Sequence, residues 1–304
     1  MAKKVLVCNP VAEEAIEMLE DAGLEVDQEF GMSKEELTEK VPPYHALIVR
    51  SSTKVREPTL EVAENLEAIG RPGIGLDNID VDFAEEKGVA VFNTPTATTI
   101  SVAELAMTHI FAAYRDIVAG TNSLREGKWI KKDLKSNELY EKTLGIIGYG
   151  NIGQAVAKRA KAFGMDVIAF DVRDIESPEP AEMVDMDSLL EKSDVITIHV
   201  PHIEATHHML STEEFEKMKD NAVLVDPSRG GVVDEDALYE ALKNDVIRFA
   251  SKDVFEEEPP GENPLFELDN FHATPHIGAQ THEGQIRAGT LAAEQVIEEL
   301  EKRG

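Results

Sequence analysis

The feature that most constrains the fold is a regular alternation of short apolar segments with helix-like segments along all 304 residues. Strand-like segments lie at residues 5–8, 46–49, 67–69, 89–91, 143–147, 167–170, 195–198 and 222–225. Helix-like segments between them include 12–22, 152–163, 186–191 and 236–242. Strict alternation favours parallel strands joined by right-handed helical crossovers. We therefore predict an α/β protein with doubly wound parallel sheets.

Two such alternating blocks are present, and a helix lies between them. The segment Ser101-Val-Ala-Glu104 has the spacing of a capping box, so we predict a connecting helix from there to about Tyr114. The final helix-like segment, 282–302, follows a loop after the second block. We expect it to return and pack on the first block.

The formal net charge of −29 excludes some classes of partner. An acidic surface repels nucleic acid and anionic membranes, so we expect neither. No apolar run reaches the roughly 20 residues of a membrane span, and the short run after Lys4 does not resemble a signal peptide. We expect a cytoplasmic protein in which the single cysteine, Cys8, is buried and unreactive.

The sharpest local motif is Gly148-Tyr-Gly150-Asn-Ile-Gly153, between a predicted strand and a predicted helix. In this context the first glycine permits a tight turn, the second lets the backbone approach a pyrophosphate, and the third lets helix and strand pack closely. Asp171 follows the next strand, where a carboxylate hydrogen-bonds a ribose 2′-hydroxyl and repels a 2′-phosphate. We expect NAD as cofactor, although the nearby Arg173 leaves NADP open.

Polar side chains of three later segments suit hydride-transfer chemistry. Arg229 follows a predicted strand, where an arginine binds a carboxylate with two hydrogen bonds. Glu258 and His276 follow two further short strands, and a histidine paired with a carboxylate is a general acid and base near neutral pH. Each residue alone has an ordinary structural explanation, as a surface ion pair, part of an acidic run or a structural histidine.

Together these segments resemble the D-isomer-specific 2-hydroxyacid dehydrogenase family over nearly the whole chain. The resemblance runs through residues 50–55, 70–80, 101–104, 144–153, 228–231, 253–259 and 274–278. It implies a Rossmann-type NAD-binding domain at 99–281 and a flavodoxin-like, discontinuous substrate domain made of 1–98 plus 282–304. The chain ends soon after its last helix, so we expect a short form that lacks the regulatory domains of longer members and feedback inhibition by serine.

The resemblance also implies residue roles. Arg229 would orient the substrate, His276 would exchange the hydroxyl proton, and Glu258 would hold His276. The implied cofactor-binding residues are Gly148, Gly150, Asn151, Ile152, Gly153, Asp171, Pro201, Thr206, Ser228, Arg229, Asp253, His276 and Gly278. The implied substrate-binding residues are Arg50, Arg71, Gly73, Ile74, Gly75, Thr98, Lys131, Arg229 and His276.

The substrate is a small 2-hydroxy or 2-oxo acid, and the cations Arg50, Arg71 and Lys131 favour a phosphorylated one. Within the family the closest likeness is to members that oxidise D-3-phosphoglycerate, the first step of serine biosynthesis. The alternative is a glyoxylate or hydroxypyruvate reductase, because these share the same three residues. A remote alternative is an NAD(H)-sensing corepressor, which the acidic surface disfavours.

The chain departs from the family pattern at several positions. Thr98 stands where asparagine is common and Lys131 where arginine is usual. Ser251-Lys252 replaces apolar residues before Asp253, and Asp226 replaces a common asparagine. By resemblance we expect a homodimer formed around residues 101–135. We expect no metal, and we interpret His202, His207 and His208 as loop residues.

Overall fold

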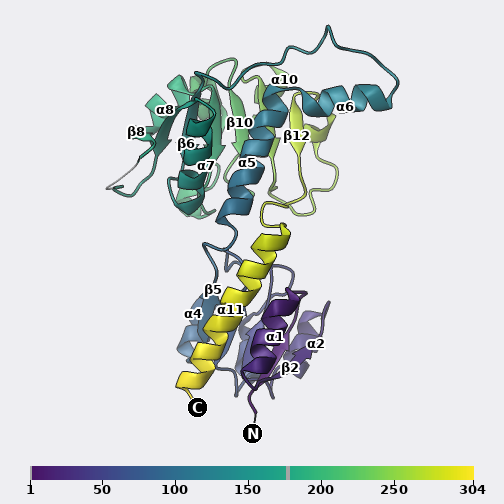
Figure 1. The fold of residues 1–304 in the computed structure, drawn as a ribbon, viewed down its shortest axis with the longest axis vertical. Coiled ribbons are helices and arrows are strands. Elements are labelled where there is room, and N and C mark those ends of the chain that lie inside the picture. The colour runs from purple at the N-terminus through teal and green to yellow at the C-terminus, as the bar shows by residue number, and fades with distance from the viewer. Residues whose placement is uncertain (1, 176–178) are drawn as a thin grey trace. The chain divides into compact units, whose positions relative to one another are not determined.

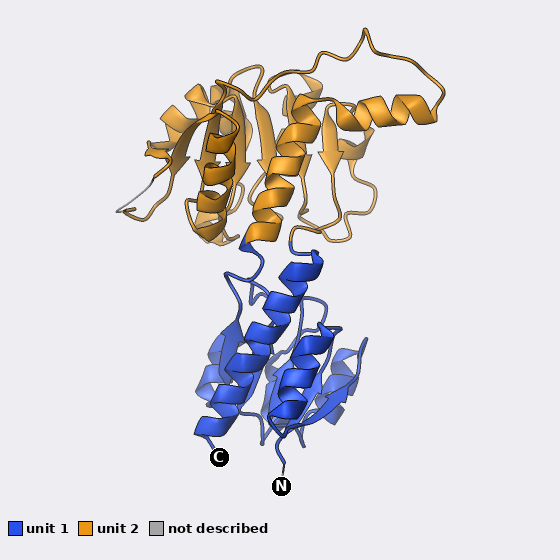
Figure 2. Cartoon of the chain, in the orientation of Figure 1, with its two compact units in different colours: residues 1–99, 279–304 blue, residues 100–278 orange. Residues whose placement is uncertain are grey.

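The chain divides into two compact units, each with its own parallel sheet (Figures 1 and 2). The computed structural model describes residues 2–175 and 179–304. The first unit comprises Met1–Thr99 and Ala279–Gly304, and the second comprises Ile100–Gly278.

The first unit is a five-stranded parallel sheet with the order β2-β1-β3-β4-β5. Its strands are β1 (Lys4–Val7), β2 (Glu25–Gln28), β3 (Ala46–Ile48), β4 (Ala68–Arg71) and β5 (Ala90–Asn93). Its helices are α1 (Glu13–Asp21), α2 (Lys34–Lys40), α3 (Glu57–Val62), α4 (Val81–Glu86) and α11 (His282–Lys302). This is the flavodoxin-like strand order, with its topological switch point between β1 and β3.

Apolar cores cover both faces of this first sheet. On one face, Val5 and Val7 of β1 pack with Val296 and Leu300 of the last helix. On the other face, Leu6 packs among side chains of the neighbouring strands, because successive side chains of a strand point to opposite faces. Figure 1 shows α11 lying beside α1 over this sheet, so the last segment of the chain belongs to the first unit.

The second unit is a seven-stranded sheet with the order β12-β11-β10-β9-β6-β7-β8, parallel throughout its registered pairs. Its strands are β6 (Thr143–Ile147), β7 (Asp166–Phe170), β8 (Glu182–Met183), β9 (Val195–Ile198), β10 (Val223–Asp226), β11 (Phe249–Lys252) and β12 (Phe271–Ala273). Its helices are α5 (Thr99–Tyr114), α6 (Ile117–Arg125), α7 (Asn151–Ala162), α8 (Met186–Lys192), α9 (Thr212–Lys217), α10 (Glu235–Lys243) and the 3-10 turns η1 (Glu204–Thr206) and η2 (Pro264–Glu267). Read in chain order, the sheet has the Rossmann arrangement 3-2-1-4-5-6 with one strand added, and two apolar cores cover its faces. The predicted α/β architecture of two parallel sheets is confirmed.

One local prediction is wrong. The long helix α5 (Thr99–Tyr114) begins two residues before Ser101, so Ser101 lies inside the helix and is buried instead of capping it. A turn in which the N–H of Thr99 donates to the carbonyl of Thr96 leads directly into the helix and sets its start. Glu104 pairs instead with Arg159 of α7, at 3.2 Å.

Strand β2 was not predicted, because its sequence Glu-Val-Asp-Gln is polar and mostly exposed at the edge of the sheet. Cys8 is fully buried, and this burial raises the pKa of its thiol to about 12. None of the helices formed by the described residues combines the length and the apolar character that a membrane crossing needs.

Candidate active site

The loop between β6 and α7 is shaped by its glycines. Gly148 has φ +91°, and a side chain there would lie 2.6 Å from the carbonyl oxygen of His199. A side chain at Gly153 would lie 2.3 Å from the carbonyl oxygen of Gly148. Gly150 precedes the twelve-residue helix α7, and no side chain caps that helix. The free N–H groups and the dipole at the start of α7 fit the pyrophosphate of a dinucleotide.

Asp171 lies directly after β7, next to this loop. Its Oδ2 accepts hydrogen bonds from the Tyr149 N–H at 2.8 Å and from Arg173 Nη2 at 2.8 Å. Its Oδ1 accepts bonds from the backbone N–H and Nε of Arg173, both at 2.9 Å. The side-chain hydrogen bonds of Arg173 lower the pKa of Asp171 most, and although burial opposes them the pKa falls to about 2. A carboxylate is therefore held beside the glycine loop, as a ribose hydroxyl requires.

The side chains of His276 and Glu258 form a hydrogen-bonded pair. His276 Nδ1 lies 2.7 Å from Glu258 Oε2, while Glu258 Oε1 accepts the N–H of Phe255 at 3.1 Å. Burial alone would raise the pKa of Glu258, but the hydrogen bond and charge of His276, the Phe255 N–H and the charge of Arg229 together lower it. The carboxylate therefore stays ionised beside an imidazole whose side chain is 48% exposed.

Asp253 holds the loop that carries His276. This residue follows β11 and is 1% exposed. Its Oδ1 accepts the N–H of Ile277 at 2.8 Å and its Oδ2 accepts that of Gly278 at 2.7 Å, while its carbonyl accepts the N–H of His276 at 2.8 Å. Sequence reasoning connected Asp253 with the cofactor and missed this contact. The available signal was that the segments of Asp253 and His276 lie close together in the sequence and that each follows a short predicted strand.

His109 extends this network into helix α5. Its Nε2 lies 3.1 Å from Thr274 Oγ1, which donates to Asp253 Oδ1 at 2.5 Å, and its Nδ1 lies 2.5 Å from Ser251 Oγ. Burial lowers the pKa of His109, so this histidine is held in its neutral form. Sequence reasoning did not identify His109, because nothing along the chain marks one position of a long apolar helix as facing a strand end.

Arg229 lies in the loop after β10, and this loop packs backbone to backbone against the loop of Glu258. Ser228 donates from its N–H and Oγ to Asp226 Oδ1, at 3.0 and 2.5 Å. A side chain at Gly230 would lie 1.8 Å from the carbonyl oxygen of Phe255, so only glycine fits there. The structure thus brings together Arg229, Glu258 and His276, which lie far apart in the sequence, at the carboxyl ends of adjacent strands.

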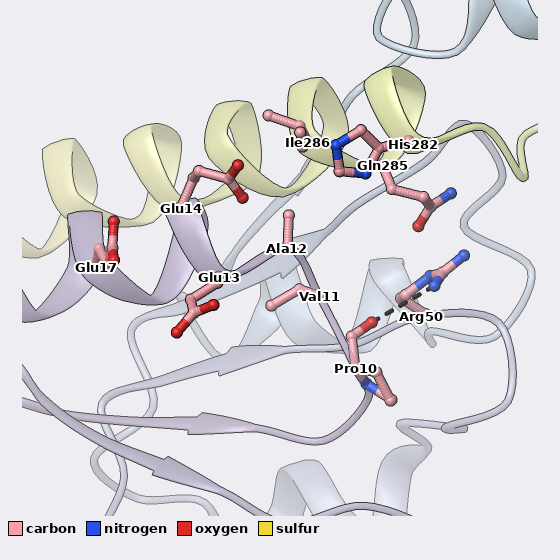
Figure 3. Close-up of a pocket in the computed structure, with 10 residues that line it drawn as sticks. All are labelled: Pro10, Val11, Ala12, Glu13, Glu14, Glu17, Arg50, His282, Gln285 and Ile286. Carbon is pink, nitrogen blue, oxygen red and sulfur yellow. Dashed lines mark hydrogen bonds between the residues drawn. The ribbon is translucent and has the colours of Figure 1, made fainter.

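In the first unit, Arg50 follows β3 and lines a cavity of about 530 Å³ at the topological switch point of the sheet (Figure 3). Its backbone N–H donates to Asn9 Oδ1 at 2.6 Å and its Nη1 to the carbonyl of Pro10 at 3.4 Å. Figure 3 shows Arg50 at one end of this cavity with His282 and Gln285 of α11, and Glu17 of α1 at the other end. Partial burial lowers the pKa of Arg50.

The loop after β4 carries the other substrate-binding candidates of this unit. Gly73 has φ +139°, and a side chain there would collide with the guanidinium of Arg71, which folds back over the loop. The loop is fixed by the Gly73 N–H, which donates to Thr94 Oγ1 at 2.7 Å, and by the carbonyl of Ile74, which accepts from Asn93 Nδ2 at 2.6 Å. Gly75 follows in the same loop. Thr98 is only 1% exposed, and its Oγ1 has no hydrogen-bond partner among the described residues.

The remaining candidates lie in loops and at a helix start of the second unit. Thr206 Oγ1 donates to the carbonyl of Pro201 at 2.6 Å, which closes the segment after β9. Asn151 and Ile152 form the first turn of α7. Lys131 is exposed and lines an apolar pocket beside α6.

The three histidines after β9 lie in an irregular segment that contains η1. His202 Nε2 is 3.1 Å from His207 Nδ1, and His208 Nε2 is 3.0 Å from Glu256 Oε1. Among residues 2–175 and 179–304, no three His, Cys, Asp or Glu side chains are grouped as a metal ion would require.

Comparison with known proteins identifies the family. Residues 107–278 match the profile of the D-isomer specific 2-hydroxyacid dehydrogenase, NAD binding domain. The chain is 49% identical over 301 residues to a hydroxypyruvate reductase of Thermotoga maritima, and the match covers 98% of each chain. The chain belongs to the D-isomer specific 2-hydroxyacid dehydrogenase family. The predicted family and the predicted cofactor, NAD, are thereby confirmed.

Other members of the family are similar over the whole chain. A D-3-phosphoglycerate dehydrogenase of Methanocaldococcus jannaschii is 51% identical over 297 residues, which are 96% of this chain but 56% of that protein. The chain therefore spans about half the length of that relative. The NAD⁺-bound 3-phosphoglycerate dehydrogenase of Entamoeba histolytica is 29% identical, with a TM-score of 0.84 over 100% of this chain and 97% of that one.

Proposed function

We propose that this protein is an NAD-dependent D-2-hydroxyacid dehydrogenase that oxidises D-3-phosphoglycerate to 3-phosphohydroxypyruvate. The observation that carries the chemistry is the 2.7 Å pair of His276 and Glu258 beside the loop of Arg229. It combines a proton acceptor, an anion that stabilises the protonated acceptor, and a cation for the substrate carboxylate. The phosphorylated substrate is supported by the names of several relatives, including those of Methanocaldococcus and Entamoeba.

In the proposed mechanism, Arg229 binds the carboxylate of the 2-hydroxy acid with its guanidinium. Because Nδ1 of His276 is occupied by Glu258, Nε2 is the nitrogen that receives the hydroxyl proton in oxidation and returns it in reduction. A bound NAD would supply the acceptor for the hydride that leaves C2. Glu258 stabilises the imidazolium that forms, and Asp253 keeps the His276 loop in place through its bonds to two N–H groups.

The cofactor would be held by residues whose arrangement fits it. The uncapped start of α7 with Asn151 and Ile152 would hold the pyrophosphate, and Asp171 would bind the ribose hydroxyls. Pro201, Thr206, Ser228 and Gly278 lie in loops that follow strands of the same sheet, where open α/β sheets bind ligands.

The phosphate of the substrate would bind in the cavity of Arg50. Ligands of open α/β sheets bind at the switch point, and Arg50 lies there, next to His282 and Gln285. Arg71 lies in the loop after β4 of the same unit, where the backbone N–H groups of Ile74 and Gly75 would bind an anionic group of the substrate, since the Gly73 N–H already donates to Thr94. Thr98 belongs to the same set through its unpartnered hydroxyl.

A hydroxypyruvate reductase is the second candidate. It is supported by the Thermotoga relative, which is 49% identical to this chain over 98% of each chain. Both candidates use the same three residues, so only the requirement for a phosphate group separates them.

The test compares NAD-linked oxidation of 3-phosphoglycerate with reduction of phosphohydroxypyruvate, hydroxypyruvate and glyoxylate in wild type and Arg50→Ala. We expect the phosphorylated pair to be preferred, with a loss of about 10- to 100-fold in kcat/KM on Arg50→Ala. Arg56→Ala is the matched control, because Arg56 pairs with Asp80 at 2.6 Å in the same unit and lies outside the cavity. Preference for unphosphorylated acids, unchanged in Arg50→Ala, would establish the reductase instead.

A homodimer is also part of the proposal. Helix α6 and the segment after it expose large apolar side chains: Ile117 (56%), Leu124 (60%), Trp129 (80%) and Tyr140 (63%). Exposed apolar side chains of this kind are typical of protein interfaces, and Lys131 lines the same pocket as Ile117, Leu124 and Trp129. We expect Leu124→Glu to shift the mass measured by light scattering from dimer to monomer. An unchanged mass, or a monomeric wild type, would reject this interface.

A further inference from the structure

Lys252 is a charged side chain that the fold buries completely. It is the last residue of β11, it has 0% side-chain exposure, and it immediately precedes Asp253. Its Nζ lies 3.1 Å from Glu235 Oε1 and 3.6 Å from Asp226 Oδ2, and Asp226 is also 0% exposed. Burying an ammonium ion costs free energy unless carboxylates compensate its charge. We call Lys252, Asp226 and Glu235 together the charge cluster.

Two of these charges face each other across neighbouring strands. Strands β10 and β11 are parallel and in register, with Asp226 opposite Lys252. The carboxylate on one strand is therefore opposed by the ammonium group on the next.

Through Asp226, the charge cluster connects to the loop of Arg229. Asp226 turns its Oδ2 toward Lys252, while its Oδ1 accepts the N–H and Oγ of Ser228. Ser228 immediately precedes Arg229, and the Arg229 Nη1 donates to the Ser228 carbonyl at 2.7 Å. The position of Asp226 therefore sets the backbone from which the Arg229 side chain projects.

Through Glu235, the charge cluster connects to the loop of Glu258. Glu235 begins α10, and its Oε1, which faces Lys252, also accepts the N–H of Glu256 at 3.0 Å. Its Oε2 accepts Asn263 Nδ2 at 2.8 Å. Glu256 is two residues before Glu258, and the carbonyl of the preceding Phe255 meets Gly230 of the Arg229 loop.

We propose that Lys252 is a positioning residue that holds the loops of Arg229 and Glu258 in a fixed relation to each other. The ammonium group attracts two carboxylates, and each of them binds the backbone N–H of a different loop. This inference rests on the proposed function, because the distance between a substrate-binding arginine and a His–Glu pair matters only if both act on one substrate. A misplacement of about 1 Å is enough to cost about 100-fold in rate.

The test uses the full chain with four variants. Lys252→Met removes the ammonium and leaves Asp226 as an unpaired buried carboxylate, so we expect the Tm to fall by roughly 10 °C. Asp226→Asn/Lys252→Met removes both charges and keeps an oxygen for Ser228, so we expect the Tm to return to near the wild-type value. Glu235→Gln leaves the Asp226–Lys252 pair intact. Lys219→Met is the matched control, because Lys219 pairs with Asp194 at 3.0 Å outside both loops.

Two measurements separate positioning from folding. In the double variant we expect kcat for NADH-linked reduction of hydroxypyruvate to stay about tenfold or more below wild type, with NADH affinity within about threefold. We also expect faster hydrogen–deuterium exchange in peptides covering residues 228–231 and 254–258. Glu235→Gln should speed exchange only at 254–258, and Lys219→Met should change neither exchange nor kcat.

Wild-type kcat and wild-type exchange in the double variant would overturn the inference, and the buried charges would then only balance each other. This result stays decisive if Lys252→Met alone does not fold. An absence of turnover in wild type with every 2-oxo acid would reject the proposed function instead. In that case the exchange rates still decide whether Lys252 holds the two loops.

Discussion

The loop after β6 and the loops after β10, β11 and β12 lie at the same edge of one sheet but are built in opposite ways. The first depends on missing side chains, because Gly148 and Gly153 allow approaches that any Cβ would block. The others also include one close approach, at Gly230, but are held mainly by buried polar side chains, with Asp226, Asp253 and Lys252 each at most 1% exposed. The start of α7 thus keeps N–H groups that no side chain caps, whereas carboxylates bind backbone N–H groups of the other three loops.

Because the two kinds of loop are held differently, we expect substitutions to disrupt them in different ways. A pyrophosphate is bound by backbone groups, so the glycine loop fails by steric obstruction. Proton transfer needs one imidazole held in one orientation, so the other loops fail when a carboxylate or an ammonium group is lost. The four predictions below test this contrast.

The largest effect is expected at His276. His276→Ala removes the group proposed to exchange the proton, so we expect kcat to fall by about 1,000-fold or more in stopped-flow or steady-state assays. NADH affinity, measured by fluorescence titration, should stay within about threefold, because the glycine loop is untouched. Glu258→Gln should lower kcat by a smaller factor than His276→Ala, because the imidazole remains. A residual rate in His276→Ala close to wild type would remove this histidine from the chemistry.

At Gly153 we expect the main effect on NADH binding. In Gly153→Ala the new methyl group meets the Gly148 carbonyl, so we expect the Kd for NADH to rise by about 100-fold as the loop shifts. The control is Gly88→Ala in the first unit, where φ is +78° but the space is open, so only stability should fall. Equal NADH binding by Gly153→Ala and wild type would contradict the steric account.

A smaller effect is expected at Asp171. This residue combines the two ways of holding a loop, because its carboxylate binds the Tyr149 N–H of the glycine loop. Asp171→Ala should lower kcat/KM for NADH by about tenfold and frees Arg173 to meet a 2′-phosphate. We therefore expect the preference for NADH over NADPH to narrow or reverse. Unchanged selectivity would show that Asp171 does not choose the cofactor.

The smallest effect is a pH dependence of stability. Arg173 holds the pKa of Asp171 at about 2 in the folded protein, below the 3.8 of a free carboxyl. A lowered folded pKa contributes stability that is fully present above about pH 4 and is lost as the pH falls toward 2. We expect the Tm of wild type to fall more between pH 5 and pH 3 than that of Asp171→Asn, in calorimetry. Equal changes of Tm with pH in wild type and Asp171→Asn would show that the Asp171–Arg173 ion pair contributes nothing to folding stability.

Much of the fold was predictable from local pattern. The strand at 143–147 and the last helix were predicted close to their observed bounds, because buried parallel strands are continuous apolar runs and amphipathic helices repeat on one face. Edge strand β2 and the start of α5 were not, because they are decided by neighbouring strands and by a turn rather than by their own composition.

The α/β class and the glycine loop were predictable from the sequence, because both follow from residues that are close together in the chain. Local patterns indicated Arg229, Glu258 and His276 one by one at three strand ends, and the family resemblance implied that Glu258 holds His276, which lies 2.7 Å from it. The contacts of Asp253 with the loop after β12 and of Lys252 with two carboxylates became visible only in the folded structure. These contacts join residues of different strands, and their geometry depends on strand order and register, which no local pattern encodes.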